Sequence, residues 1–264
     1  MQSPAGQTLP QQVMMKWYTT RTVLSGAWLG ALAIMYFVLV YPVAIAEADP
    51  SDYRFTFFVI ALIYAVDLGI LSLEWLYKVV RPPKAIPPTT AAGKLNALGM
   101  GLRTAFVVSV GGSYVTGAAV ATPTVFAFLQ FLAGGGTVTI LADYLHSIFA
   151  TLLVTFGLVI VIYELAKIGK HKGTFKDWLV KARYPEVKLF YWMFAVAVIV
   201  QGFVGLFMLG TISPIGPFPF PFVGNLAYGL ETLLRHIHGP LGAVTFALFT
   251  NLVYFRLRPE FSVR

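Results

Sequence analysis

The chain has 264 residues, of which 58% are hydrophobic and only 11% are charged. Soluble domains carry about 25% charged residues, so the composition excludes a water-soluble globular protein and indicates an integral membrane protein. The chain has no cysteine, which excludes disulfides, cysteine-ligated zinc and cysteine-ligated iron–sulfur clusters in this subunit. The formal net charge is +8. The basic residues follow the membrane topology described below, so we expect no nucleic-acid partner.

Six apolar stretches are long enough to cross a membrane, because a spanning helix needs about 20 mainly apolar residues. We therefore predict an all-α integral membrane protein with six transmembrane helices. A shorter apolar stretch at 126–136 ends in a glycine run and is interpreted as a re-entrant or interfacial element. In chain order the six spans run from about Thr22 to Ala46, Phe55 to Tyr77, Leu95 to Ala121, Tyr144 to Ile168, Leu189 to Leu209 and His236 to Phe255.

Basic residues alternate between the connections that join the spans. The N-terminal tail, the connections at 78–94 and 167–188, and the C-terminus are rich in Lys and Arg. The intervening connections are acidic or nearly neutral. By the positive-inside rule, this alternation over an even number of spans places both termini in the cytoplasm. We predict a multi-pass protein of the cell membrane.

A proline-rich segment at 81–94, RPPKAIPPTTAAGK, divides the chain. Prolines favour extended, stiff connections, and the segment is predicted to be a cytoplasmic linker. It separates an N-terminal two-helix hairpin, residues 1–80, from a four-helix core, residues 95–264.

The core contains an internal repeat. YLHSIFATLLVTFGLVIVIYEL (144–165) aligns without a gap with HIHGPLGAVTFALFTNLVYFRL (236–257), and the alignment places His146 on His238. The spans that precede these two also resemble each other, since each follows Lys-Leu and has a glycine-rich end. We predict two copies of one hairpin in parallel repeat. The copies cover residues 93–168 and 187–260.

The two aligned histidines lie at the outer start of their spans, at the same predicted membrane depth. Ionisable groups in such positions are costly and often functional. Two neutral imidazoles facing each other across a helix bundle are the axial ligands of a low-spin b-type haem, and Arg235 would hold a propionate. His236 either supports this site or replaces His238 as the ligand, and the repeat favours His238. The competing interpretation is that both histidines merely lie near lipid headgroups.

A second bis-histidine haem would need ligands about four turns further along the same helices. The residues there are Ile160 and Leu252, and no histidine occurs nearby. We therefore predict one haem b.

Two segments of the core resemble a known family. They are HKGTFKDWLVKARYPEVKLFYWMFAVAVIVQGFVGLFM (171–208) and HIHGPLGAVTFALFTNLVYFRLRPE (236–260). The first is similar to the loop and following span of the cytochrome b subunits of membrane-bound nickel–iron hydrogenases and formate dehydrogenases. The second is similar to that family's last haem-bearing span. The resemblance covers about residues 94–260.

The resemblance implies a four-helix core that holds b haem, anchors an extrinsic catalytic subunit and passes electrons between that subunit and quinone. Carried over by position, His146 and His238 match the ligands of the haem nearer the outer face. The histidine of the family's His-Ile-Tyr motif is replaced by Val161 in one repeat and by Leu252 or Val253 in the other. These departures put the family's second haem in doubt. The hairpin at 22–78 lies outside the family's usual core.

We therefore expect a non-catalytic electron-transfer subunit of a respiratory complex. Its expected partners are an iron–sulfur, molybdopterin or haem protein on the non-cytoplasmic face, other membrane subunits, quinone and bilayer lipid. The docking surface is predicted at 122–145 and 213–225, where prolines and phenylalanines are frequent. The candidates for hydrogen bonding a quinone are Asp143, Tyr144, Gln201 and Asn251, and Gln201 is equally suited to bonding a neighbouring helix.

Two carboxylates lie seven residues apart on one face of the second span. Asp67 is deep and serves either a proton path or a helix–helix hydrogen bond. Glu74 has Lys78 at i+4, which predicts an ion pair. Two alternative functions stay open: a cofactor-free transporter or channel that uses Asp67, and an assembly subunit whose histidines bind nothing.

Overall fold

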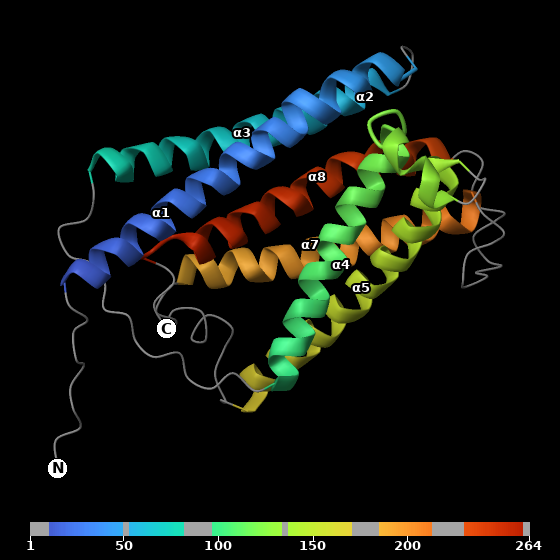
Figure 1. The fold of residues 1–264 in the computed structure, drawn as a ribbon. Helices are drawn as coiled ribbons and strands as arrows, with labels where there is room; N and C mark the ends of the chain where they lie inside the picture. The colour runs from blue at the N-terminus through green and yellow to red at the C-terminus, as the bar shows by residue number, and fades with distance from the viewer. Residues whose placement is uncertain are drawn as a thin grey trace.

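The computed structural model describes residues 11–49, 53–81, 97–133, 137–170, 185–212 and 230–260. Within these ranges the chain is helical, and none of them contains a β-strand. The elements, shown in Figure 1, are α1 (Gln11–Ala33), η1 (Ile34–Val40), α2 (Tyr41–Glu47), α3 (Arg54–Val80), α4 (Ala97–Ala121), η2 (Ala127–Ala133), α5 (Val138–Lys170), α7 (Pro185–Ile212) and α8 (Leu230–Leu257).

Among the residues that the structure describes, six helical segments are long and apolar enough to span a membrane, as predicted for an all-α membrane protein. The first span combines α1, η1 and α2 into one 31-residue segment. The chain is thus a multi-pass membrane protein by length and composition of its helices. The spans are Trp17–Glu47, Arg54–Val80, Thr104–Ala121, Val138–Tyr163, Val187–Gly205 and Leu233–Leu257.

The first span changes helix type at η1, which is a π-helix. Pro42 follows it directly, within the first turn of α2. A proline in a helix lacks an N–H group and its ring clashes with the carbonyl four residues earlier, here that of Val38. The wider π turn accommodates this clash, and α1 and α2 remain one continuous span.

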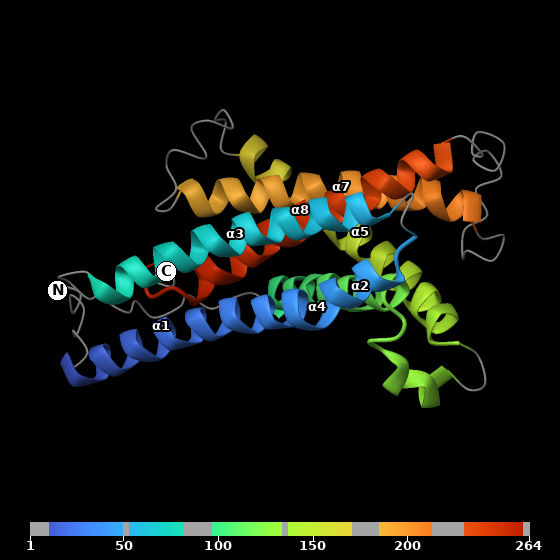
Figure 2. The same cartoon turned by 90° about the horizontal axis from the view of Figure 1, so that it is seen from above.

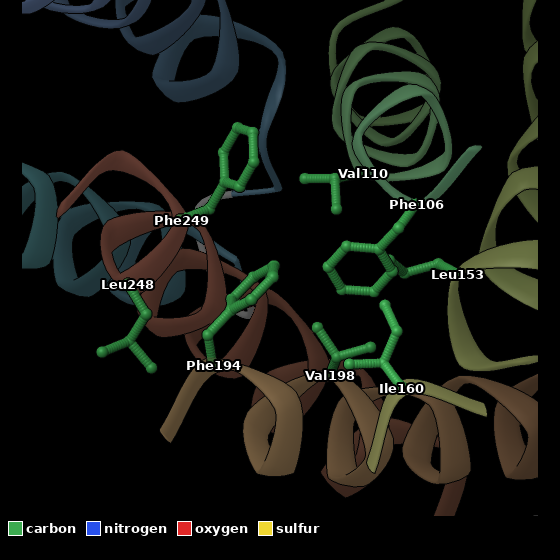
Figure 3. Close-up of a cluster of buried hydrophobic side chains, with 8 residues drawn as sticks. All are labelled: Phe106, Val110, Leu153, Ile160, Phe194, Val198, Leu248 and Phe249. Atoms are coloured by element: carbon green, nitrogen blue, oxygen red, sulfur yellow. The ribbon is translucent and has the colours of Figure 1, made fainter. Parts of the chain in front are cut away.

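The helices α4, α5, α7 and α8 form a four-helix core. α4 packs on α5, α5 on α7 and α7 on α8. Tyr114 of α4 closes the ring, since its hydroxyl donates to the backbone oxygen of Gly242 on α8 at 3.0 Å. Each helix contributes two side chains to one buried apolar cluster, seen in Figure 3. The cluster consists of Phe106, Val110, Leu153, Ile160, Phe194, Val198, Leu248 and Phe249.

The first two spans pack against this core through α8. α3 lies along α8, and α1 contacts both α3 and α8, as Figures 1 and 2 show from two directions. A second apolar cluster joins the three helices and contains Leu29, Leu32, Leu68, Leu71 and Tyr254. Because these side chains would face lipid in the separated helices, the cluster stabilises the packing through van der Waals contacts and not through the hydrophobic effect.

The two ends of the helix bundle differ in their residues. The histidine end is where α4 and α7 end and α5 and α8 begin. The basic end is the opposite one, where α3, α5 and α8 end near Lys78, Arg81, Lys170 and Arg258.

The apolar stretch predicted as a re-entrant or interfacial element contains η2, a short 3-10 helix at the histidine end. Two parts of the predictions lie outside the described residues: the proline-rich linker beyond Arg81 and the docking segment at 213–225.

Candidate functional site

His146 and His238 face each other between α5 and α8 at the histidine end. Their ring centroids are 6.3 Å apart and their ring planes are inclined at 88°. Each histidine is the ninth residue of its helix, so both are placed about two turns inside the bundle. The structure therefore brings together the two histidines that the repeat aligned.

The ring of His146 is held by α4. Its Nδ1 lies 2.9 Å from the backbone oxygen of Ser113 and 3.1 Å from Oγ1 of Thr116. Because a carbonyl oxygen can only accept, Nδ1 carries the hydrogen and donates it. The lone pair of the neutral ring is then on Nε2, the arrangement that second-shell carbonyls impose on metal-ligating histidines.

The ring of His238 is held by Gln201 on α7. Nε2 of the Gln201 amide lies 3.2 Å from Nδ1 and 3.3 Å from Nε2 of the ring, and donates to the backbone oxygen of His238 at 3.0 Å. The other amide atom, Oε1, is buried without a hydrogen-bond partner. Rotation of the amide would present this oxygen as an acceptor for the ring N–H, so Gln201 can serve either as a donor or as an acceptor to the ring.

His236 points to a different part of the molecule. Its Nδ1 lies 2.7 Å from Oγ1 of Thr56 on α3, and its ring stacks on Tyr53 with centroids 5.2 Å apart. The side chain therefore contacts the N-terminal hairpin, whereas His238, two residues later, faces His146. Arg235 is half-buried and lies one turn before His238 on the same helix.

A glycine adjoins each histidine of the pair. A Cβ atom on Gly117 would come within 3.1 Å of Cε1 of His146, and one on Gly205 within 3.2 Å of Cε1 of His238. These separations are shorter than almost all real contacts of a Cβ atom. In both hairpins, then, a glycine of the first helix leaves room for the histidine of the second.

The separation of the paired imidazoles is compatible with an edge-to-face ring contact and with two axial ligands of one haem. In a haem with two axial histidines, each iron–imidazole bond is about 2 Å long, like the zinc–imidazole bond, and each ring centre lies about 1.1 Å beyond its nitrogen. The centres of the two opposing rings are therefore about 6.2 Å apart. The observed separation is 6.3 Å. An edge-to-face ring pair without metal has centroids at about 4.5–7 Å, so spectroscopy has to distinguish the two.

A haem needs only two ligands from the protein, because the porphyrin supplies four nitrogens. A metal ion bound by side chains alone needs more. Among the residues that the structure describes, no group of three or more His, Asp or Glu side chains is placed to hold such an ion.

The four quinone candidates are dispersed. Gln201 contacts His238, and Asn251 donates a hydrogen bond to Asp67. Asp143 and Tyr144 are exposed at the first turns of α5, with Tyr144 60% exposed. The two amides therefore bond neighbouring helices, as amides inside membranes often do.

Sequence reasoning missed the residues that hold His146 and His236. Ser113, Thr116 and Gly117 follow one another on α4 within a polar and glycine-rich run, and this run is the signal that could have identified them. Thr56 has no comparable signal, because its contact joins helices whose residues are 180 positions apart.

Comparison of the chain with protein-family models, with curated proteins and with solved structures gives no match. The resemblance to hydrogenase and formate dehydrogenase cytochromes thus stays a prediction from the two segments quoted above.

Proposed function

We propose that this chain is the membrane-embedded b-type cytochrome subunit of a respiratory redox complex. It transfers electrons between a redox partner on the non-cytoplasmic face and the quinone pool through one haem b. The observation that carries the proposal is the His146–His238 pair, whose separation of 6.3 Å suits two ligands of one iron. When bound, the haem supplies a one-electron carrier.

The protein side chains hold the site and fix its protonation. His146 presents Nε2, because its Nδ1 hydrogen is donated to the Ser113 carbonyl. Gln201 orients the ring of His238 from the opposite side. Gly117 and Gly205 keep the space beside both rings free of side chains. Arg235 would hold a propionate, since guanidinium–carboxylate pairs form charge-assisted hydrogen bonds.

The proposed single haem agrees with the packing of the inner half of the core. Ile160 is 8% exposed and belongs to the apolar cluster of the four helices, and Leu252 packs against that cluster. These are the two positions where ligands of a second haem would be needed, and apolar side chains fill them. The second haem of the resembled family is therefore not part of the proposal.

The distribution of basic residues supports the proposed orientation. The histidine end faces outward in the cell membrane and both termini are cytoplasmic. The redox partner would dock at this end, where the α4–α5 connection with η2 lies. Phe128 is 69% exposed there and offers apolar contact area to a partner or to lipid.

The deciding experiment is a reduced-minus-oxidised optical spectrum of the chain purified from haem-replete cells. We expect the α-band of a b-type haem in the natural protein and its loss in His146→Ala and in His238→Ala. The matched control is His236→Ala, which removes a histidine two residues from His238 that contacts α3, and should retain the band. A folded but colourless natural protein would reject the proposal and favour a transporter or an assembly subunit.

A further inference from the structure

A seam of polar contacts joins α3 to α8 from the middle of the membrane to the basic end. Asn251 Nδ2 donates to Asp67 Oδ1 at 2.5 Å, and the Tyr254 hydroxyl donates to Glu74. Glu74 also pairs with Lys78 at 3.1 Å, the ion pair predicted from their spacing.

Asp67 is the member of this seam that lies deepest in the membrane. It is half-buried near the middle of the span Arg54–Val80, and its partner is a neutral amide. The two hydrogens of that amide are used, one by Asp67 and one by the Ala247 backbone oxygen at 2.7 Å. An ionised carboxylate in apolar surroundings costs far more than a neutral one. The amide of Asn251 can donate to Oδ1 whether the carboxyl group is ionised or protonated, so the contact holds Asp67 in place in both states.

Titratable groups from three elements flank Asp67 along the bundle. Tyr64 lies one turn earlier on α3 and stacks edge-on against Tyr36 of η1, with centroids 4.3 Å apart. Towards the basic end, Glu74 follows on α3 and Tyr254 on α8. The hydroxyl of Tyr254 can relay a proton, and Glu74 lies at the surface itself, since its side chain is 33% exposed.

We propose that Asp67 is a proton-binding site of the membrane interior, loaded from the basic end through Glu74 and Tyr254. One proton moves from solvent to the Asp67 carboxylate, and only O–H bonds break and form on the way. Seven residues separate the two carboxylates, which is about 10 Å along the helix. Leu71 is 5% exposed between them, so loading requires a transient water at this point. The proposal is independent of the haem, since no contact of the seam involves the histidine pair.

Labelling with dicyclohexylcarbodiimide tests the site in the full chain, reconstituted in lipid nanodiscs. The reagent adds the O–H of a protonated carboxyl across its C=N bond and partitions into apolar surroundings. We expect a mass adduct on Asp67 that forms at least tenfold faster at acidic than at alkaline pH. A water-soluble carbodiimide should not label Asp67, and Asp67→Asn should give no adduct there. Absence of the adduct at every pH would overturn the proposal.

Infrared detection of hydrogen–deuterium exchange at the Asp67 carboxyl tests the route. Tyr254→Phe should slow the exchange at least tenfold, because it removes the hydroxyl that contacts Glu74. Tyr64→Phe is the matched control on the other side of Asp67 and should leave the rate unchanged. Equal rates in the two variants would refute the route. If the purified protein shows no haem spectrum but still forms the carbodiimide adduct on Asp67, the haem proposal is rejected and the proton-site proposal is retained.

Discussion

Two adjacent glycines of α4 provide a sharp test of the packing that positions the site. A Cβ atom on Gly112 would lie 2.5 Å from Cγ and 2.6 Å from Cε1 of Phe149 on α5. A Cβ atom on Gly111 would have no neighbour within 4 Å. Alanine at these two positions should therefore change the stability of the protein in opposite directions.

The magnitudes follow from two opposing terms. Alanine is favoured over glycine in a helix by about 1 kcal/mol, and Gly111→Ala should gain most of this. Overpacking of an interior costs about 1–3 kcal/mol, and the overlap at Gly112 involves Cγ of Phe149, which cannot move without moving the whole ring. The free energy of unfolding should therefore be lower in Gly112→Ala than in Gly111→Ala by about 1–3 kcal/mol.

The assay is unfolding by sodium dodecyl sulfate in mixed micelles, followed by circular dichroism. The smaller side chain of Phe149→Leu should recover much of the loss when combined with Gly112→Ala. Equal stabilities of the two alanine variants would show that α4 and α5 do not approach each other at Gly112, and would refute the packing on which Ser113 and Thr116 depend for reaching His146.

Further predictions concern the seam and the topology. Tyr254→Phe and Glu74→Ala should be coupled by about 1 kcal/mol in a double-mutant cycle of unfolding, because the two natural side chains share one hydrogen bond. Additive effects would contradict that contact. Because the chain has no cysteine, single cysteines report sidedness directly. A membrane-impermeant maleimide should label Thr124→Cys in intact cells and Gly169→Cys only after lysis, and the reverse pattern would overturn the orientation.

The parts of the fold that were predicted correctly depend on short-range information. Each span is recognised from about 20 successive residues, and the Glu74–Lys78 pair from a spacing of four. The proximity of His146 and His238 is a long-range feature, and it was accessible only because the internal repeat placed the two residues in register. Without that register, His236 and His238 would have been equivalent candidates.

Contacts between unrelated helices could not be predicted. Gln201 was a candidate for a quinone or for a neighbouring helix, and only the packing of α7 on α8 decides that its amide contacts His238. Asp67 likewise had two interpretations, and its partner Asn251 lies 184 residues away. In a membrane every apolar helix face suits lipid equally well, so the hydrophobic pattern alone does not select the neighbour of a helix.

The pairing of α3 with α8 has a consequence for biosynthesis. Ribosomes add about 5–20 residues per second, so the 184 residues between Asp67 and Asn251 correspond to roughly 10–40 s of translation. During this interval α3 is already inserted while its amide partner has not been made. During this time Asp67 lies inside the bilayer without the Asn251 amide. A bound proton or a helper protein would then have to stabilise its carboxyl group, and this step would affect how much of the chain folds correctly.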